Sequence, residues 1–363
     1  MVEWLAGNRI RGTSTERTST TGFNSIPAVS GGWKELGRTT LGSAGDLVSV
    51  ASLPDKRYYM VLCDNRTTGA VRMNMRFNSD SGSNYSERWS AKGVTPDSTQ
   101  VSQNKMQYGQ SNVNEQGFSV HNIANLTNKE KLMIANVVSD DASTGAGTSP
   151  YRNEYVSKWV PSTASDVINE ISMYNTSAGS WNIGAECVVL GWDDSDTHTT
   201  NFWEELASVT TTGALATVDS GVFTSKKYLW CQIMTVGRSG VATNSRLRVG
   251  NTTIDVNDNY SSRRSADGGT ETPVIDVSYA ADIATNTGNQ FTNLFIINNS
   301  ANEKLIIGHT IDQNTAGAGT APRRTEFVGK HVTTGSQLDI IGMYSGGSDT
   351  FDAGAVIKVW GSN

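Results

Sequence analysis

The side chains whose types and spacing could support chemistry are mostly charged residues that occur twice. Five charged positions recur in the same order about 170 residues apart: Glu130 and Glu303, Lys131 and Lys304, Arg152 and Arg324, Glu154 and Glu326, and Lys158 and Lys330. Opposite charges at strand spacing are typical of cross-strand ion pairs or of a subunit rim, and they suit these roles better than acid–base catalysis. The sequence therefore predicts that these residues have a structural role.

Catalytic patterns of other kinds do not repeat. The four histidines, His121, His198, His309 and His331, have no counterparts in the other copy, and no nucleophile-elbow, phosphate-loop or zinc-protease spacing occurs. A duplicated enzyme would be expected to duplicate its catalytic group or to retain a degraded form of it. We therefore expect a protein that is not an enzyme and has no cofactor.

Two acidic clusters contain the oxygen ligands that Ca²⁺ prefers. Asp193, Asp194 and Asp196 lie close together, and Asp255, Asn257 and Asp258 form a weaker version of the same pattern. Neither cluster has the glycine and the distal glutamate of an EF-hand loop. The sequence favours a solvated hinge at the first cluster and predicts no metal site at either.

Four aromatic residues beside Gly, Ser and Asn turns could stack on sugar rings: Trp89, Tyr151, Trp159 and Trp181. Packing in a β-sandwich core is the commoner role of tryptophan. We therefore favour core packing for these residues, and stacking on a host surface glycan is the alternative.

The elements that position these residues are themselves repeated. Residues 130–158 and 303–330 each contain an alternating apolar run, a Gly-Ala-Gly-Thr-x-Pro turn (Gly145–Pro150 and Gly317–Pro322) and an Arg-x-Glu-x-Val strand pattern. Further matched blocks start at Trp33 and Trp203. Short apolar and aromatic runs between polar turns predict strands, and helical periodicity is nearly absent.

We therefore predict an all-β fold of two tandem homologous jelly-roll-like β-sandwich domains with an extended N-terminal arm. The predicted segments are an arm over 1–30, a first module over 31–192, a linker over 193–201 and a second module over 202–363. If both modules share an ancestor, three pairs should hold equivalent core positions: Tyr58 with Tyr228, Met173 with Met343, and Cys187 with Ile357.

Charge and composition narrow the function classes. The chain has 363 residues and a formal net charge of −6, so no general basic field exists to hold nucleic acid. Cys63, Cys187 and Cys231 lie in apolar runs and are expected to be buried thiols. No apolar run reaches the roughly 20 residues of a membrane helix, so no membrane insertion is expected, and we also expect no signal peptide.

The N-terminal arm is rich in Ser and Thr and cannot bury enough apolar surface to fold alone. It nevertheless contains side chains suited to docking on another surface: Trp4, Arg9, Arg11, Phe23 and Ile26. We expect an assembly arm, and a frayed terminus is the alternative.

From Trp33 to Gly361, the order of the blocks WKELGRTTL, KRYYMVL, GSNYSxR, NKEKL, TGAGTxP and VIKVWG resembles predicted virion proteins of marine tailed viruses, including viruses of marine archaea. These are fibre-like or decoration-like proteins built from tandem β-sandwich modules. The resemblance implies a structural or host-attachment role in a virion and transfers no catalytic residue.

Three functions are carried forward. The first is a virion structural protein, as a tail fibre, spike or capsid-decoration subunit. The alternatives are a carbohydrate-binding, lectin-like module and an extracellular filament or surface-layer subunit. The expected partners are other virion or assembly subunits, with homo-oligomers, and the expected location is a virion or an extracellular assembly.

Overall fold

The computed structural model describes residues 32–94, 96–111, 114–141, 143–163, 165–193, 196, 200–237, 243–286, 288–314, 318–346 and 350–363. Secondary structure in these residues is entirely β, and they contain no helix of the length and hydropathy needed to cross a membrane. The predicted arm over 1–30, with its docking side chains, lies outside them.

Strands β1 to β13 belong to the first half of the chain. In chain order they are β1 (Lys34–Thr40), β2 (Leu47–Val50), β3 (Tyr58–Thr68), β4 (Val71–Phe77), β5 (Tyr85–Ala91), β6 (Ser98–Gln103), β7 (Met106–Ser111), β8 (Gln116–Ala124), β9 (Lys131–Ser139), β10 (Tyr151–Trp159), β11 (Ile171–Tyr174), β12 (Ser180–Trp181) and β13 (Glu186–Trp192). The larger sheet has the order β1-β13-β3-β8-β9-β10-β5-β6, with β12 also paired to β3, and the smaller sheet has the order β2-β11-β4-β7.

Strands β14 to β26 belong to the second half. They are β14 (Glu204–Thr210), β15 (Thr217–Asp219), β16 (Tyr228–Thr235), β17 (Thr243–Asn251), β18 (Thr253–Ile254), β19 (Tyr260–Ala266), β20 (Thr272–Val277), β21 (Ala281–Asn286), β22 (Gln290–Ile297), β23 (Lys304–Asp312), β24 (Arg323–His331), β25 (Ile340–Ser345) and β26 (Val356–Ser362). The larger sheet has the order β14-β26-β16-β22-β23-β24-β19-β20, and the smaller has the order β15-β25-β17-β18, with β21 also paired to β17.

The repeat in the sequence is also a repeat in topology. Apart from β12, each strand of the first larger sheet has a counterpart at the same place in the second, so β1 corresponds to β14, β3 to β16 and β9 to β23. All pairings are antiparallel, and the described residues contain no sheet with strands from both halves. The prediction of an all-β, jelly-roll-like sandwich fold is confirmed, whereas the division into two domains with a linker over 193–201 stays a prediction.

Alternation along the strands builds a core inside each sandwich. In β4, Val71, Met73, Met75 and Phe77 point inward and are buried, whereas Arg72 and Arg76 on the other face are more exposed, as the period of two in a strand predicts. The second sandwich has its own core. All three cysteines are buried free thiols, as predicted.

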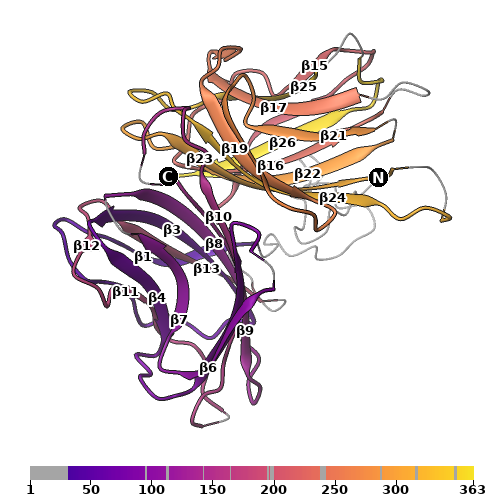
Figure 1. The fold of residues 1–363 in the computed structure, drawn as a ribbon. Helices are drawn as coiled ribbons and strands as arrows, with labels where there is room; N and C mark the ends of the chain where they lie inside the picture. The colour runs from indigo at the N-terminus through magenta and orange to yellow at the C-terminus, as the bar shows by residue number, and fades with distance from the viewer. Residues whose placement is uncertain are drawn as a thin grey trace.

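A third core lies between the two halves. It is formed by outward-facing side chains of the two larger sheets, among them Phe118 and Val138 from the first half and Leu305 and Ile307 from the second. Figure 1 shows the two halves side by side, and β8 and β9 of the first contact β23 of the second. The outer faces of the two larger sheets therefore pack against each other. The described residues form three cores, one inside each sandwich and one between them.

Two of the three predicted pairs of core positions are correct. Met173 and Met343, and likewise Cys187 and Ile357, hold matching register positions and are buried in the two sandwich cores. The prediction for the third pair is wrong, because these side chains point away from the sandwich interiors.

Within that third pair, Tyr58 and Tyr228 do hold equivalent positions in β3 and β16. Tyr58 is 38% exposed and stacks on Trp192 with 5.6 Å between ring centroids, whereas Tyr228 is buried in the third core. Their environments therefore differ according to how the halves meet.

Both halves hold the turn before β5 or β19 with an aspartate and a tyrosine. In the first half, Trp159 Nε1 donates to Asp80 Oδ2 at 2.7 Å, and the hydroxyl of Tyr85 donates to Asp80 O at 3.2 Å. In the second half, Asp255 holds the matching position and lies 3.0 Å from His331 Nε2, where the first half has tryptophan. Asp255 therefore anchors a turn, and its cluster with Asn257 has a structural role.

This difference predicts acid sensitivity in the second half. Burial lowers the pKa of His331 below its ordinary value of 6.5, although the hydrogen bond to Asp255 acts in the opposite direction. The unfolded chain then binds a proton at a higher pH than the folded chain does, so stability should fall as the pH drops below about 6.5. Thermal unfolding followed from pH 8 to pH 5 should show this slope, and His331→Gln, whose amide can still donate to Asp255, should flatten it. An unchanged slope in the variant would contradict the assignment.

Candidate binding cleft between the two sandwiches

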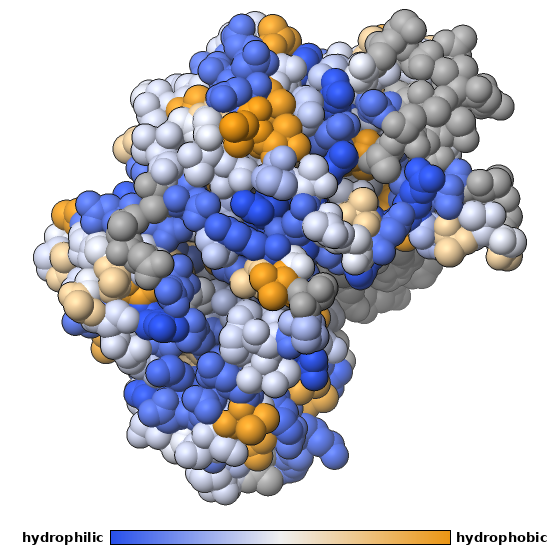
Figure 2. All heavy atoms as spheres, in the orientation of Figure 1, coloured by the Kyte–Doolittle hydropathy of each residue, from blue (hydrophilic) through white to orange (hydrophobic). Residues whose placement is uncertain are grey.

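The outward faces of β10 and β24 bring the repeated charges to the junction of the two halves. Alternate side chains of a strand share one face, so Arg152 and Glu154 point out of the first larger sheet, and Arg324 and Glu326 point out of the second. Figure 2 shows hydrophilic side chains gathered along this junction. Here the larger sheets border an open cleft of about 460 Å³.

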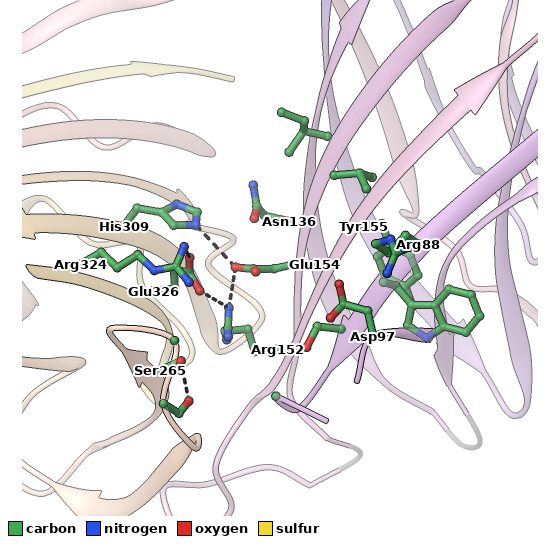
Figure 3. A pocket seen from close by; sticks show the side chains of 17 residues that line it. Arg88, Asp97, Asn136, Arg152, Glu154, Tyr155, Ser265, His309, Arg324 and Glu326 are labelled. Carbon is green, nitrogen blue, oxygen red and sulfur yellow. Dashed lines mark hydrogen bonds and ion pairs between the residues drawn. The ribbon is translucent and has the colours of Figure 1, made fainter. Parts of the chain in front are cut away.

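The cleft has one wall from each repeat. Strands β5, β9 and β10 and the segment before β6 supply one wall, and β23, β24 and the hairpin after β19 supply the other. The polar or charged lining residues include Arg88, Asp97, Asn136, Arg152, Glu154, Ser265, His309, Arg324 and Glu326. Figure 3 shows Arg152, Glu154, Glu326 and His309 converging between the walls, with Arg88 and Asp97 on the side of the first half.

Arg152 is the centre of an ion-pair network that crosses the junction. Its Nε lies 2.7 Å from Glu271 Oε1, and its Nη1 lies 2.5 Å from Glu154 Oε1 and 3.4 Å from Glu326 Oε2. His309 Nε2 lies 3.6 Å from Glu154. Both Glu271 and Glu326 belong to the second half, so one arginine of the first half holds two carboxylates of the other.

Neighbouring charges shift the pKa values of Arg152 and Glu154, each toward its charged form. Burial disfavours the charged form of Arg152, but the carboxylates of Glu154, Glu271 and Glu326 outweigh it and raise the arginine pKa. Burial also favours neutral Glu154, yet hydrogen bonding to His309 and the charge of Arg152 lower its pKa overall. Both shifts favour the charged forms, so the ion pair between Arg152 and Glu154 is favoured at neutral pH.

The turn between β9 and β10 also forms hydrogen bonds with the second half. Lys330 Nζ donates to Ser143 O at 2.8 Å, and the amide of Gly145 donates to Glu303. Gly145 has φ of +90°, a backbone conformation that favours glycine. The first copy of the repeated turn is thus bound by the Glu and Lys of the second copy.

The rest of that turn is held by β19. Ser261 Oγ donates to Thr148 O at 2.8 Å, and Arg263 Nε donates to Pro150 O at 2.9 Å. Both acceptors are backbone carbonyls, and Arg263 Nη2 also donates to the side chain of Ser149 at 3.0 Å. The turn predicted from the Gly-Ala-Gly-Thr-x-Pro pattern is an inter-repeat contact.

The four aromatic residues predicted as sugar platforms have different environments. Trp159 and Trp181 are buried in the first sandwich core, so the prediction that they stack on a ligand is wrong. Trp89 lines the cleft but stacks on buried Tyr155 at 6.1 Å. The ring of Tyr151 is half-buried under the ammonium of Lys92 at 3.5 Å.

The linker acids contact the first half. Asp196 forms an ion pair with Lys56 and accepts a hydrogen bond from the amide of Asp193, whereas Asp194 lies outside the described residues. In the described ranges no group of three or more His, Cys, Asp or Glu side chains is placed to hold a metal ion. The described acids of the predicted hinge, Asp193 and Asp196, therefore form polar contacts with each other and with the first half.

The third core is the feature that we did not predict, although the sequence contains a signal for it. In β3, the run from Tyr59 to Cys63 is apolar without interruption and entirely buried. A strand with one solvated face would alternate, so a continuous apolar run indicates burial on both faces. This run predicts a partner for the outer face of the sheet but does not identify it.

Comparison with known proteins identifies no family. No family model and no curated protein matches the chain. Among solved structures, domains LG4-5 of the mouse laminin alpha1 chain match with a TM-score of 0.17 and 10% identity, covering 93% of this chain and 92% of that one. The VP2 subviral particle of infectious bursal disease virus matches with a TM-score of 0.12 and 11% identity, covering 94% and 84%. At such TM-scores these likenesses assign no function.

Proposed function

We propose that this chain is a non-enzymatic structural subunit of a virion or a comparable extracellular assembly, as a tail fibre, spike or capsid-decoration protein. The observation that carries the proposal is the use made of the duplicated charges. Arg152 and Glu154 of the first copy bind side chains of the second half, and the repeated turn is bound there too. Residues used to join two sandwiches make a rigid scaffold, on which loops can vary for display or host attachment.

The block order from Trp33 to Gly361 supports the same proposal, because it resembles virion proteins with tandem β-sandwich modules. The arm over 1–30 is proposed to attach the subunit to its particle. Its apolar and basic side chains suit docking on a protein surface better than a purely solvated tail.

Labelling of particles tests this proposal. Antibodies raised against the purified protein should mark the surface of intact particles in electron micrographs of marine virus concentrates. Deletion of residues 1–30 should leave a folded chain that no longer co-purifies with particles. Full-length chains with Trp4→Ser and Phe23→Ser serve as the second variant, since they retain the arm and remove two of its anchors.

Two results would contradict different parts of the proposal. If the chain without residues 1–30 joins particles at the level of the full chain, the arm has no attachment role. If the full chain is absent from every particle fraction, the proposed virion role is wrong.

A further inference from the structure

The contact between the two halves uses different surfaces of the two repeats. The first repeat contributes a donor surface, defined as Phe118, Val138 and the turn 143–150. The second repeat contributes a receiving surface, which consists of Glu303, Leu305, Ile307, Val328 and Lys330. Because the repeats share one topology, each repeat should also carry its own version of the other surface.

The second repeat carries a free version of the donor surface. Phe291 and Ile311 are cross-strand partners in β22 and β23, as Phe118 and Val138 are in β8 and β9. They are 42% and 48% exposed, whereas their counterparts are buried. The described part of the second turn, residues 318–322, is exposed throughout. The apolar pair and the turn that join the halves are thus present again, uncovered.

The first repeat carries a free version of the receiving surface. Three large apolar side chains, Leu132, Ile134 and Val156, are 56%, 56% and 48% exposed. They hold the register positions of the three second-repeat side chains that the third core buries, namely Leu305, Ile307 and Val328. Large apolar groups clustered on one sheet face and left in water favour a protein partner.

The polar contacts are duplicated as well. The residues that hold the first turn are Glu303, Lys330, Ser261 and Arg263, and the residues at the matching positions of the first repeat are Glu130, Lys158, Ser86 and Arg88. Residue type is the same at all four positions. Lys330 is fully buried by the bound turn, whereas Lys158 is 43% exposed and pairs with Glu130 at 3.0 Å.

The charges of the free surfaces are complementary. Arg324, the counterpart of Arg152, is 63% exposed. The residues at the positions of its expected partners Glu271 and Glu326 are Asp97 and Glu154, which line the cleft. An arginine from a second molecule would therefore meet carboxylates in the open cleft, as Arg152 does within the chain.

We propose that the donor surface of the second repeat docks on the receiving surface of the first repeat of another copy of this chain. The partner is a second copy because the two free surfaces are the two sides of a contact that the chain already makes internally. Contact between unlike surfaces is heterologous, so it continues from copy to copy into a ring or a filament.

The contact between copies should be weaker than the internal one. Within the chain, Lys227 Nζ lies 3.2 Å from Asp64 and 2.9 Å from Glu186. The residues at the positions of those two carboxylates in the second repeat are Met234 and Val356, so this ion pair has no equivalent between copies. Association should therefore depend on concentration.

Analytical ultracentrifugation of the full chain tests the inference. The mean mass should rise above that of one chain, 39.0 kDa, as the concentration increases. Ile311→Asp damages the free donor surface and Leu132→Asp the free receiving surface, so each variant should weaken association by at least about tenfold. Leu47→Asp is the matched control, since Leu47 is 55% exposed on the smaller sheet and should leave association unchanged.

A mixture of the two variants distinguishes head-to-tail contact from other association. Ile311→Asp keeps a working receiving surface and Leu132→Asp keeps a working donor surface, so together they should form pairs and nothing larger. A wild-type chain that stays at the mass of one copy, variants that associate like the wild type, or a mixture without pairs would each overturn the inference.

The inference rests on the proposed structural role, but the two can fail separately. Particle labelling without self-association would overturn the inference alone. Self-association of a chain that is absent from all particles would overturn the proposed virion role alone, and long unaided polymers would then favour a filament or surface-layer subunit.

Discussion

Replacement of Arg152 by alanine is expected to cost about 3–5 kcal/mol of unfolding free energy, because it removes the cation that Glu154, Glu271 and Glu326 share at the junction. Glu271 is the most affected, since its side chain is 3% exposed and accepts a 2.7 Å hydrogen bond from Arg152. Urea unfolding followed by tryptophan fluorescence measures the effect at the right place, because Trp203, Trp230 and Trp360 belong to the third core.

The repeat supplies the control for this prediction. Arg324→Ala removes the same residue type from the same strand position, but Arg324 is 63% exposed and its ion pair within the described residues is with neighbouring Glu326 at 3.2 Å. An exposed pair of this kind contributes under about 1 kcal/mol. The double variant Arg152→Ala with Glu271→Gln should recover part of the loss, because the uncompensated carboxylate is gone. Equal effects of Arg152→Ala and Arg324→Ala would contradict the role given to the network.

This contrast shows how far sequence reasoning reaches in this chain. The repeat, the strand content and the turn at Gly145 follow from local patterns, because turn chemistry and a period of two are local properties. The burial of repeated positions does not follow from local patterns. Arg152 and Arg324 have the same sequence pattern and nearly opposite exposure, since exposure depends on which faces of the two sandwiches meet.

The same limit explains the errors on single aromatic residues. Tyr58 and Tyr228 hold one register position, yet only Tyr228 is covered by the other half. The strand pattern predicts that Tyr58 and Tyr228 point to the same side of their sheets, but it does not predict whether that side faces water. For Trp159 and Trp181, polar turns nearby suggested access to a ligand, although both indoles point into a sandwich.

Trp181→Ala is expected to lower the unfolding free energy of the first sandwich by about 3–5 kcal/mol, the cost of truncating a large buried aromatic side chain. Trp181 is fully buried in the first core. It also forms the β-bridge to Gly45 that connects β12 with the segment before β2. Urea unfolding of the full chain measures the loss, and ligand binding should play no part in it.

The second repeat provides the milder substitution for comparison. Its bridge joins Leu215 to Phe351, so phenylalanine holds the position of Trp181 in the matching sandwich. Phe351 is buried there as Trp181 is. Trp181→Phe should therefore cost far less than Trp181→Ala, because it keeps most of the ring volume and removes an indole N–H that has no hydrogen-bond partner in its buried site. If Trp181→Ala leaves stability unchanged and instead abolishes binding to a glycan, the core role is wrong and the ligand-stacking role that the sequence suggested is restored.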